Sequence, residues 1–188
     1  MKTADVIIVG SGASGLFNAL FLPQDYKVIV ITKKEVEESD SFLAQGGISA
    51  LKNPEDYDSY FEDTMKAGHY ENDKGAVEKM IKESPQIIQD LKDFGVRFDL
   101  KDGEIEFTRE GGHSTFRILH HEDLTGKEIT SHLYEEAKKR DNITIMENCT
   151  MIDIIEKDGE CKGIVYKDAD GNLDTIEAPD TVLATGGL

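Results

Sequence analysis

The sequence predicts an α/β fold organised around a parallel β-sheet. Two short apolar runs rich in β-branched residues, Asp5–Val9 and Lys27–Thr32, indicate strands that are buried on both faces. The stretch between them, roughly Ser14–Leu22, favours a helix that stops near Pro23. A strand, a helix and a second strand in this order form a βαβ unit, whose crossover is expected to be right-handed.

Three glycines stand between the first strand and the helix, in the pattern Gly10-x-Gly12-x-x-Gly15. They permit a tight turn, a close approach of the backbone to a pyrophosphate, and close packing of the helix on the strand. The helix N-terminus adds free N–H groups and a partial positive charge. Because the motif follows a strand, opens a helix and precedes a second strand, it predicts a Rossmann-type dinucleotide-binding domain rather than a structural turn alone.

The middle of the chain is more helical. Apolar residues at helical spacing and a stop at Gly95 support this interpretation. Extended segments at Ile105–Thr108 and Phe116–Leu119 flank a polar, glycine-rich loop, Arg109–Ser114. Helices are predicted over Asp56–Gly68, Lys74–Phe94 and Gly126–Arg140.

From residue 144 onward the pattern favours strands. A small β-meander is predicted over Cys149–Glu177, with turns at Asp158-Gly159 and Asp170-Gly171. A last buried strand, Thr181–Ala184, leads into a glycine turn, which should feed a further element. The sequence is therefore interpreted as a truncated domain. Individual strands are predicted at Thr144–Met146, Met151–Glu156, Gly163–Lys167 and Asp174–Glu177.

Charge and composition narrow the function classes. The 188 residues contain 21 Lys and Arg against 38 Asp and Glu, a formal net charge of −17, which disfavours nucleic acid and anionic membrane surfaces as partners. No window approaches the roughly 18 apolar residues of a membrane span. The two cysteines, Cys149 and Cys161, match no zinc or CxxC spacing, so we expect ordinary strand cysteines in a reducing cytoplasm.

Two segments after the βαβ unit have more than one interpretation. The second strand ends in Thr32-Lys33-Lys34, where many NAD-binding domains carry an acid, so Lys33 either contacts a cofactor phosphate or the adenosine end, or is a plain surface lysine. The next segment can run its backbone against a flat ring system, or can be a glycine-rich helix start. It comprises Asp40, Ser41, Phe42, Leu43, Ala44, Gln45, Gly46 and Gly47.

Five motifs occur in an order that resembles the succinate dehydrogenase/fumarate reductase flavoprotein superfamily, and within it the L-aspartate oxidase family. The resemblance covers essentially the whole chain, and the block at Thr108–Ser114 is its most specific part. The five motifs are Val9–Gly15, Ser41–Gly47, Thr108–Ser114, Asp123–Gly126 and Ala184–Gly187.

The resemblance implies non-covalently bound FAD and oxidation of L-aspartate to iminoaspartate, with oxygen or fumarate as the acceptor. This reaction would be the first step of de novo NAD biosynthesis, and the quinolinate-forming next enzyme would be a partner. Residues 1–188 would form an N-terminal FAD-binding domain that is incomplete, with the capping domain beyond it. The flavin would accept the hydride, and the protein would supply orientation and electrostatics.

Carried over by position, the resemblance also assigns the cofactor-binding residues. The glycine motif would hold the diphosphate, Lys33 the adenosine side, and the main chain of Thr150 and Met151 the adenine. Residues 40–47 would line the flavin. The glycine-motif residues are Gly10, Ser11, Gly12, Ala13, Ser14 and Gly15.

Two positions separate the enzymes of this superfamily. Members that bind FAD covalently place a histidine where this chain has Asp40, so no histidyl link is expected. Glu110 stands where L-aspartate oxidases keep a carboxylate near the substrate's amino group, and a charge-assisted contact there distinguishes aspartate from succinate. From spacing alone, Glu110 would be a solvated loop acid, whereas the family match favours a catalytic role for Glu110.

His113, His120 and His121 lie near Glu110 in the sequence, but their spacing is not that of metal ligands, so no metal site is predicted.

Two rival functions follow from the same residues. One is a fumarate reductase or succinate dehydrogenase flavoprotein subunit, against which Asp40 and Glu110 argue. The other is a non-catalytic FAD-binding module, since 188 residues would lack the part that closes over the flavin. For that reason the chain alone is expected to be inactive.

Overall fold

A computed structural model describes residues 2–187 of the chain. The chain divides into two compact units. The first comprises Met1–Ala44 and Ile129–Leu188, and the second comprises Gln45–Glu128. The first unit holds the parallel sheet and the meander, and the second holds two long helices and short strands. Among the described helices, none combines the length and apolar character needed to cross a bilayer.

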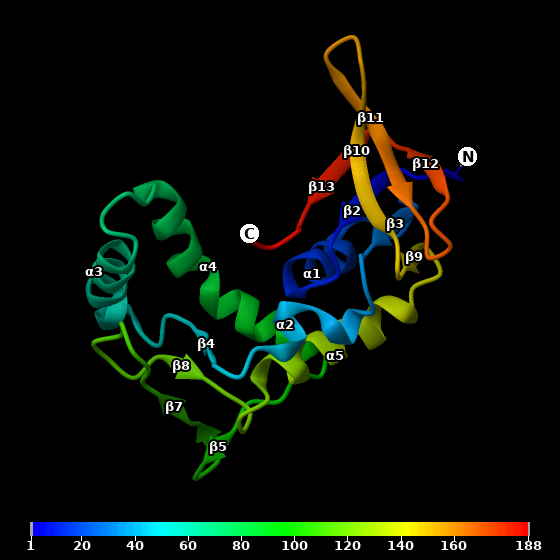
Figure 1. The fold of residues 1–188 in the computed structure, drawn as a ribbon. Coiled ribbons are helices and arrows are strands. Elements are labelled where there is room, and N and C mark those ends of the chain that lie inside the picture. Colours follow the sequence, from blue (N-terminus) through cyan, green and yellow to red (C-terminus); the bar gives the residue numbers. More distant parts are fainter. Residues whose placement is uncertain (1, 188) are drawn as a thin grey trace. The chain divides into compact units, whose positions relative to one another are not determined.

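A four-stranded parallel sheet forms the centre of the first unit (Figure 1). Its order is β13 (Asp180–Leu183), β2 (Val6–Val9), β3 (Val28–Ile31) and β9 (Ile143–Met146). Helix α1 (Ala13–Phe21) connects β2 to β3 and completes the predicted βαβ unit. Every residue of β2 and β3 is buried, which explains why their sequences are continuously apolar.

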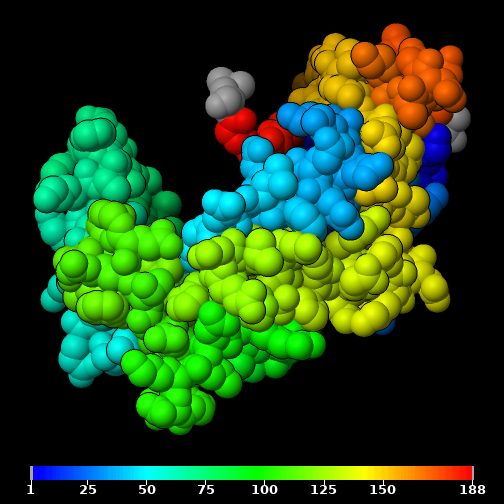
Figure 2. All heavy atoms as spheres, turned by 60° about the horizontal axis from the view of Figure 1, so that its bottom comes forward, coloured from blue at the N-terminus to red at the C-terminus, as the bar shows by residue number. Residues whose placement is uncertain are grey.

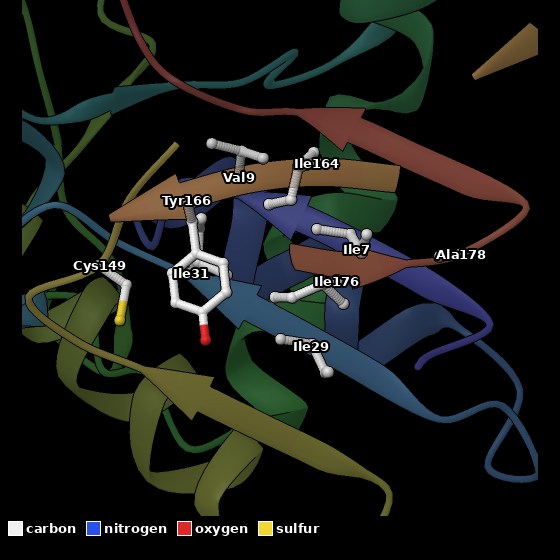
Figure 3. Close-up of a cluster of buried hydrophobic side chains, with 9 residues drawn as sticks. All are labelled: Ile7, Val9, Ile29, Ile31, Cys149, Ile164, Tyr166, Ile176 and Ala178. Carbon is white, nitrogen blue, oxygen red and sulfur yellow. The ribbon is translucent and has the colours of Figure 1, made fainter. Parts of the chain in front are cut away.

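Alternate side chains of the sheet fill two separate layers of core. On one face Ile8 and Val30 pack with Ala19 of α1. On the other face Ile7 and Ile31 pack against side chains of the meander, as Figure 3 shows. The meander contributes Ile164, Tyr166 and Ile176 to that layer, and Ala178, just after β12, adds to it.

The predicted meander is confirmed, with strands that begin one to three residues earlier than expected. It consists of β10 (Thr150–Lys157), β11 (Glu160–Lys167) and β12 (Leu173–Glu177), paired antiparallel in this order. A short N-terminal strand, β1 (Lys2–Thr3), adds to β12 in parallel. The pattern of two residues per repeat places Ile164 and Tyr166 on the inner face, where both are buried.

The turn between β10 and β11 shows why the dipeptide Asp158-Gly159 stands there. Lys157 pairs with Glu160, so the loop has two residues. Their φ angles are +58° and +81°, the left-handed values of the hairpin turn that matches the twist of the strands. Glycine adopts these values without strain, and aspartate tolerates them better than most residues.

The second unit contains the predicted helices α3 (Tyr57–Ala67) and α4 (Lys74–Asp93). Their facing sides pack through Tyr60, Met65 and Ile81, all buried. Helix α5 (Thr125–Lys138) begins among the residues of this unit and ends among those of the first. The remaining elements are short: β4 (Ile48–Ser49), η2 (Pro54–Asp56), β5 (Leu100–Lys101), β6 (Glu104–Ile105), β7 (Phe107–Thr108) and β8 (Ile118–Leu119).

Helix α4 continues through Pro85 because a neighbouring side chain takes over the lost hydrogen bond. Proline has no N–H to donate to the carbonyl of Ile81 four residues earlier. The hydroxyl of Ser84 donates to that carbonyl instead, with an O···O distance of 2.7 Å. The same Ser84 oxygen accepts the backbone N–H of Leu51 at 2.8 Å, which ties the helix to the segment after β4.

Candidate functional site

A cleft of about 540 Å³ opens in the first unit at the carboxyl ends of β2, β3 and β13. Ligands of parallel α/β sheets bind at these strand ends, where the connections diverge. The cleft is lined by residues 9–12 with Ser14, 31–35 with Glu38, 39–41, 149–151 and 183–186.

The glycine motif leaves the floor of this cleft without side chains. Gly10 has φ +116°, and a Cβ built on it would lie 2.1 Å from the carbonyl oxygen of Ala184. A Cβ on Gly15 would lie 2.0 Å from the carbonyl oxygen of Gly10, so only glycine lets α1 pack this closely on the turn. Gly12 faces Ser41, whose hydroxyl oxygen would be 2.8 Å from such a Cβ. Gly10 and Gly15 therefore have steric roles, as predicted, whereas the approach of a pyrophosphate to Gly12 stays a prediction.

Ser11 stands at the N-terminal end of α1 with an unused hydroxyl. The residue is buried, and its Oγ has no hydrogen-bond partner among the described residues. No side chain caps α1, whose N-cap is Gly12. A buried hydroxyl without a partner is costly unless a ligand completes it. Together with the free N–H groups of the helix start, this arrangement suits an anion such as a diphosphate.

The segment after β3 forms the other wall of the cleft. Lys33 is exposed and lines the cleft, and Lys34 forms an ion pair with Glu38 at 2.9 Å. The 3₁₀ turn η1 (Val36–Glu38) is held by Glu147, whose Oε1 accepts the backbone N–H of Val36 at 2.8 Å. Figure 2 shows this light-blue segment at the surface, beside the yellow surface of the region between β9 and β10.

Thr150 and Met151, the first residues of β10, line the cleft, and their contact with the adenine stays a prediction. The backbone N–H of Cys149 donates to the carbonyl of Thr32 at 2.9 Å, which joins the start of β10 to the end of β3. Cys149 also lines the cleft and precedes the strand, so only Cys161 is a strand cysteine. Burial raises the pKa of the Cys149 thiol, which keeps it protonated.

Residues 40–43 form the short helix α2 (Asp40–Leu43), with the Ser39 hydroxyl accepting the N–H of Phe42 at 3.3 Å. These four residues are helical, whereas Gly46 and Gly47 lie outside the helix, and the placement of the segment along the flavin stays a prediction. Asp40 and Ser41 line the cleft. The lining of the cleft does not include Ala13, Gly15, Phe42, Leu43 and Ala44.

The second unit brings the remaining candidates together. Gln45, Gly46 and Gly47 lead into β4, and the N–H of Gly47 donates to Oε1 of Glu110 at 3.3 Å. A Cβ on Gly46 would lie 3.4 Å from Oε2 of the same carboxylate. Glu110 is exposed, so its carboxylate is held beside the glycine pair while remaining accessible.

Three histidines of this unit, His113, His120 and His121, face charged side chains of the same unit. His113 Nδ1 lies 3.1 Å from the guanidinium of Arg117, and His120 Nδ1 lies 3.1 Å from a carboxylate oxygen of Asp99. His121 also faces Asp99, at 3.4 Å. Within residues 2–187, no group of three or more His, Cys, Asp or Glu side chains is placed to hold a metal ion.

Sequence reasoning missed several residues that line the cleft. Glu35 and Glu38 line the cleft a few residues after Lys33. The loop that follows the second strand of a dinucleotide-binding domain often contacts the cofactor, and this position could have indicated both residues. Ala184 and Gly186 belong to a motif recognised in the sequence, but its place beside Gly10 depends on the parallel pairing of β13 with β2. Cys149 carried no signal of its own.

A family model described as an FAD-binding domain matches residues 5–188. The chain belongs to this family. The cleft fits the cofactor, because the unpartnered Ser11 hydroxyl and the floor made by Gly10 and Gly12 are what a dinucleotide diphosphate requires. FAD is therefore the cofactor of this domain.

Curated relatives of this FAD-binding domain are L-aspartate oxidases. The enzyme of Clostridium perfringens is 42% identical over 187 residues, which cover 100% of this chain and 42% of the relative. The enzyme of Clostridium acetobutylicum is 43% identical over 185 residues, 98% of this chain and 42% of the relative. The chain thus spans about two fifths of the length of these relatives.

A solved structure with the same fold is a chain of a quinol fumarate reductase. A variant of the FrdA chain of Escherichia coli quinol fumarate reductase superposes with a TM-score of 0.92 at 28% identity. The superposition covers 100% of this chain and 33% of that chain. It confirms the predicted α/β fold of a Rossmann-type FAD-binding domain with a small meander.

Proposed function

We propose that this chain is the N-terminal FAD-binding part of an L-aspartate oxidase, which converts L-aspartate to iminoaspartate with oxygen or fumarate as acceptor. Two curated relatives, 42% and 43% identical over 100% and 98% of this chain, are L-aspartate oxidases. The activity belongs to a protein of the relatives' length. In that protein the reaction opens de novo NAD biosynthesis in the cytoplasm, and the quinolinate-forming enzyme is the partner that consumes the product.

The first unit holds the cofactor in this proposal. The Ser11 hydroxyl and the first N–H groups of α1 bind the diphosphate, and Lys33 lies on the adenosine side. Bound FAD supplies the two-electron acceptor for oxidation of the substrate. Asp40 replaces the histidine of covalent flavoproteins, so the cofactor is held by contacts alone. Residues 40–47 line the flavin, and Thr150 with Met151 meets the adenine through main-chain groups.

Glu110 carries the substrate specificity in this proposal. Its carboxylate is exposed, accepts the N–H of Gly47 at 3.3 Å, and lies 3.4 Å from the position that a Cβ on Gly46 would take. An exposed carboxylate held in this way is suited to face the ammonium group of an amino acid. Succinate and fumarate have no such group, so Glu110 favours aspartate over both. This carboxylate beside Gly47 is the observation that carries the assignment.

The two carboxylates of aspartate need cations, and Arg109 and Arg117 are the arginines nearest to Glu110 in the sequence. Arg117 is buried and bonded to Asp56 and Asp63, and Arg109 lies over the ring of Phe116 at 5.8 Å. A dicarboxylate is oriented by bidentate, accessible guanidinium groups. We therefore propose that the 188-residue chain alone does not turn over L-aspartate, although its cleft retains some affinity for the ADP half of FAD.

The proposal is tested by Glu110→Gln in a protein of the relatives' full length. Losing a charge-assisted contact costs about 1.5–3 kcal/mol, so kcat/KM for L-aspartate should fall roughly ten- to a hundred-fold. Fumarate reduction should change much less, because fumarate brings no ammonium. Glu104→Gln, at an exposed glutamate of the same unit, is the matched control. Equal losses with both substrates would remove Glu110 from this role.

A second candidate is a fumarate reductase or succinate dehydrogenase flavoprotein, favoured by the superposition at a TM-score of 0.92. The two candidates differ in what reduces the flavin under anaerobic conditions. The proposed oxidase should be bleached by L-aspartate and not by succinate. Bleaching by succinate alone would select the second candidate.

A further inference from the structure

Arg117 is a fully buried arginine at the end of the loop that carries Glu110. Its guanidinium makes two bonds to Asp56, Nε–Oδ2 at 2.8 Å and Nη2–Oδ1 at 2.7 Å, and Nη1 lies 2.6 Å from Oδ2 of Asp63. It also stacks over the ring of Tyr60 at 4.9 Å. Such a charge is tolerated in the interior only because both carboxylates and the neighbouring hydroxyl of Ser59 satisfy its donors.

The same two carboxylates also hold the loop itself. Oδ2 of Asp63 accepts the backbone N–H of Ser114 at 2.7 Å and its hydroxyl at 2.8 Å. Oδ1 of Asp56 accepts the hydroxyl of Thr115 at 2.7 Å. Arg117 therefore orients Asp56 and Asp63, and these in turn fix the loop at Ser114 and Thr115. The bonds lower the pKa of Asp56, chiefly through Arg117, and keep both groups ionised.

The rest of the loop has few other anchors. Gly111 and Gly112 are exposed, and a Cβ on either would meet no atom within 4 Å. Two adjacent glycines allow many backbone conformations, so they do not by themselves hold Glu110 in place. One bond joins Glu110 to the anchored half, from the N–H of His113 to the carbonyl of Glu110 at 3.2 Å. His113 in turn contacts Arg117 through Nδ1 at 3.1 Å.

We propose that Asp63, oriented by Arg117, is the positioning residue that holds the Glu110 carboxylate beside Gly47 for recognition of the substrate's ammonium. This inference rests on the proposed function of Glu110. Asp63 touches no substrate in this arrangement. It acts by fixing Ser114, and through His113 it fixes the backbone of Glu110.

The anchoring is measured first by hydrogen–deuterium exchange on the 188-residue chain and on the longer protein. Asp63→Asn should speed exchange of the amides of residues 109–116 about ten-fold or more, while those of β2 and β3 stay protected. Asp58→Asn, at an exposed carboxylate of the same helix, is the matched control and should change neither. Unchanged exchange in the loop of Asp63→Asn would overturn the inference.

The effect on recognition is measured in the longer protein by a double-mutant cycle. Asp63→Asn should raise KM for L-aspartate about ten-fold with a smaller effect on kcat, and should add almost nothing in a Glu110→Gln background, because the two residues act as one unit. A loss that persists in full in that background would show that Asp63 acts elsewhere, and would overturn the inference.

A milder variant guards against loss of folding in Asp63→Asn. Ser114→Ala removes one of the two bonds from Ser114 to Asp63 and leaves the ion pair with Arg117 intact. It should shift exchange and KM in the same direction by about two- to five-fold, and no shift in either would count against the inference. Failure of the proposed function is distinguishable from failure of this inference. If Glu110→Gln leaves aspartate turnover unchanged, the proposed function of Glu110 is wrong. In that case Asp63→Asn would speed exchange in the loop without raising KM for L-aspartate.

Discussion

The carbonyl oxygen of Ala184 occupies the space beside Gly10 where any other residue would carry its Cβ, at 2.1 Å from the ideal position of that atom. This contact exists because β13 and β2 run in parallel register, with Leu183 opposite Val9. It joins the first and last motifs of the sequence at the floor of the cofactor cleft.

Gly10→Ala should destabilise the first unit strongly. The substitution forces a backbone clash with Ala184 and strains a residue at φ +116°, and positive-φ strain alone costs about 1–3 kcal/mol. Gly103→Ala is the matched control, because Gly103 has φ +86° but no atom within 4 Å of its Cβ. Urea unfolding of both variants separates the clash from the strain. Equal losses of stability would show that the contact with Ala184 does not matter.

Ser11→Ala should weaken cofactor binding without destabilising the free protein. Its hydroxyl is buried and has no partner within residues 2–187, so removing it relieves a cost in the free state and loses a bond of about 1.5–3 kcal/mol to a bound diphosphate. Thr130→Val is the matched control, since the Thr130 hydroxyl in α5 is also buried without a partner in that range and lies away from the cleft. Titration with FAD and with ADP should show weaker binding only for Ser11→Ala. Unchanged affinity would place the diphosphate elsewhere.

The cofactor should separate from the full-length protein on denaturation. Asp40 has no nitrogen that forms a stable link to the flavin ring, and it lies in α2 with Ser41 at the cleft. After acid precipitation and filtration, all yellow colour should be in the filtrate. Flavin fluorescence that migrates with the polypeptide on a denaturing gel would contradict this prediction.

The buried cluster around Arg117 should make the second unit sensitive to acid. The pKa of Asp56 is held below its ordinary 3.8, chiefly by its hydrogen bonds to Arg117. A lowered folded-state pKa means that this contribution to stability is complete above 3.8 and is lost as the pH falls through the lower folded value. The difference in unfolding free energy between wild type and Asp56→Asn should be constant from pH 7 to about 5 and shrink on further acidification.

Urea unfolding at several pH values measures this difference. Breaking a buried pair by removing one partner costs about 3–5 kcal/mol near neutral pH. Exposed Asp58→Asn serves as the control and should show no such gap. A gap that widens as the pH falls would contradict the sign of the argument.

The first unit was largely predictable because its signals are local. The continuous apolar runs of β2 and β3, the glycines between them and the Asp-Gly turn of the meander each restrict the backbone within a few residues. The helix α4 was predicted to within one residue at its end because its apolar spacing and the stop at Gly95 are local as well.

The candidate site was predictable only in part. The sequence indicated Ser11 and Thr150 by resemblance, but their shared cleft depends on β10 starting beside the end of β3, through Cys149 and Thr32. Helix α2 was ambiguous because Asp40–Leu43 is too short for a periodic signal. The assignment of each residue to flavin, diphosphate or adenine stays a prediction.

By itself the sequence determined the βαβ unit with its glycine turn, the meander and the long helices, since each depends on signals from residues close in the chain. Only the tertiary structure decided that β9 would pair with β3 and β13 with β2, and that Arg117 would be a buried anchor and not a free cation for the substrate. These outcomes depend on partners that are far apart in sequence, such as Asp56 and Arg117. No local pattern encodes which distant carboxylate an arginine meets, because that pairing is set when the core forms and buried charges must find partners.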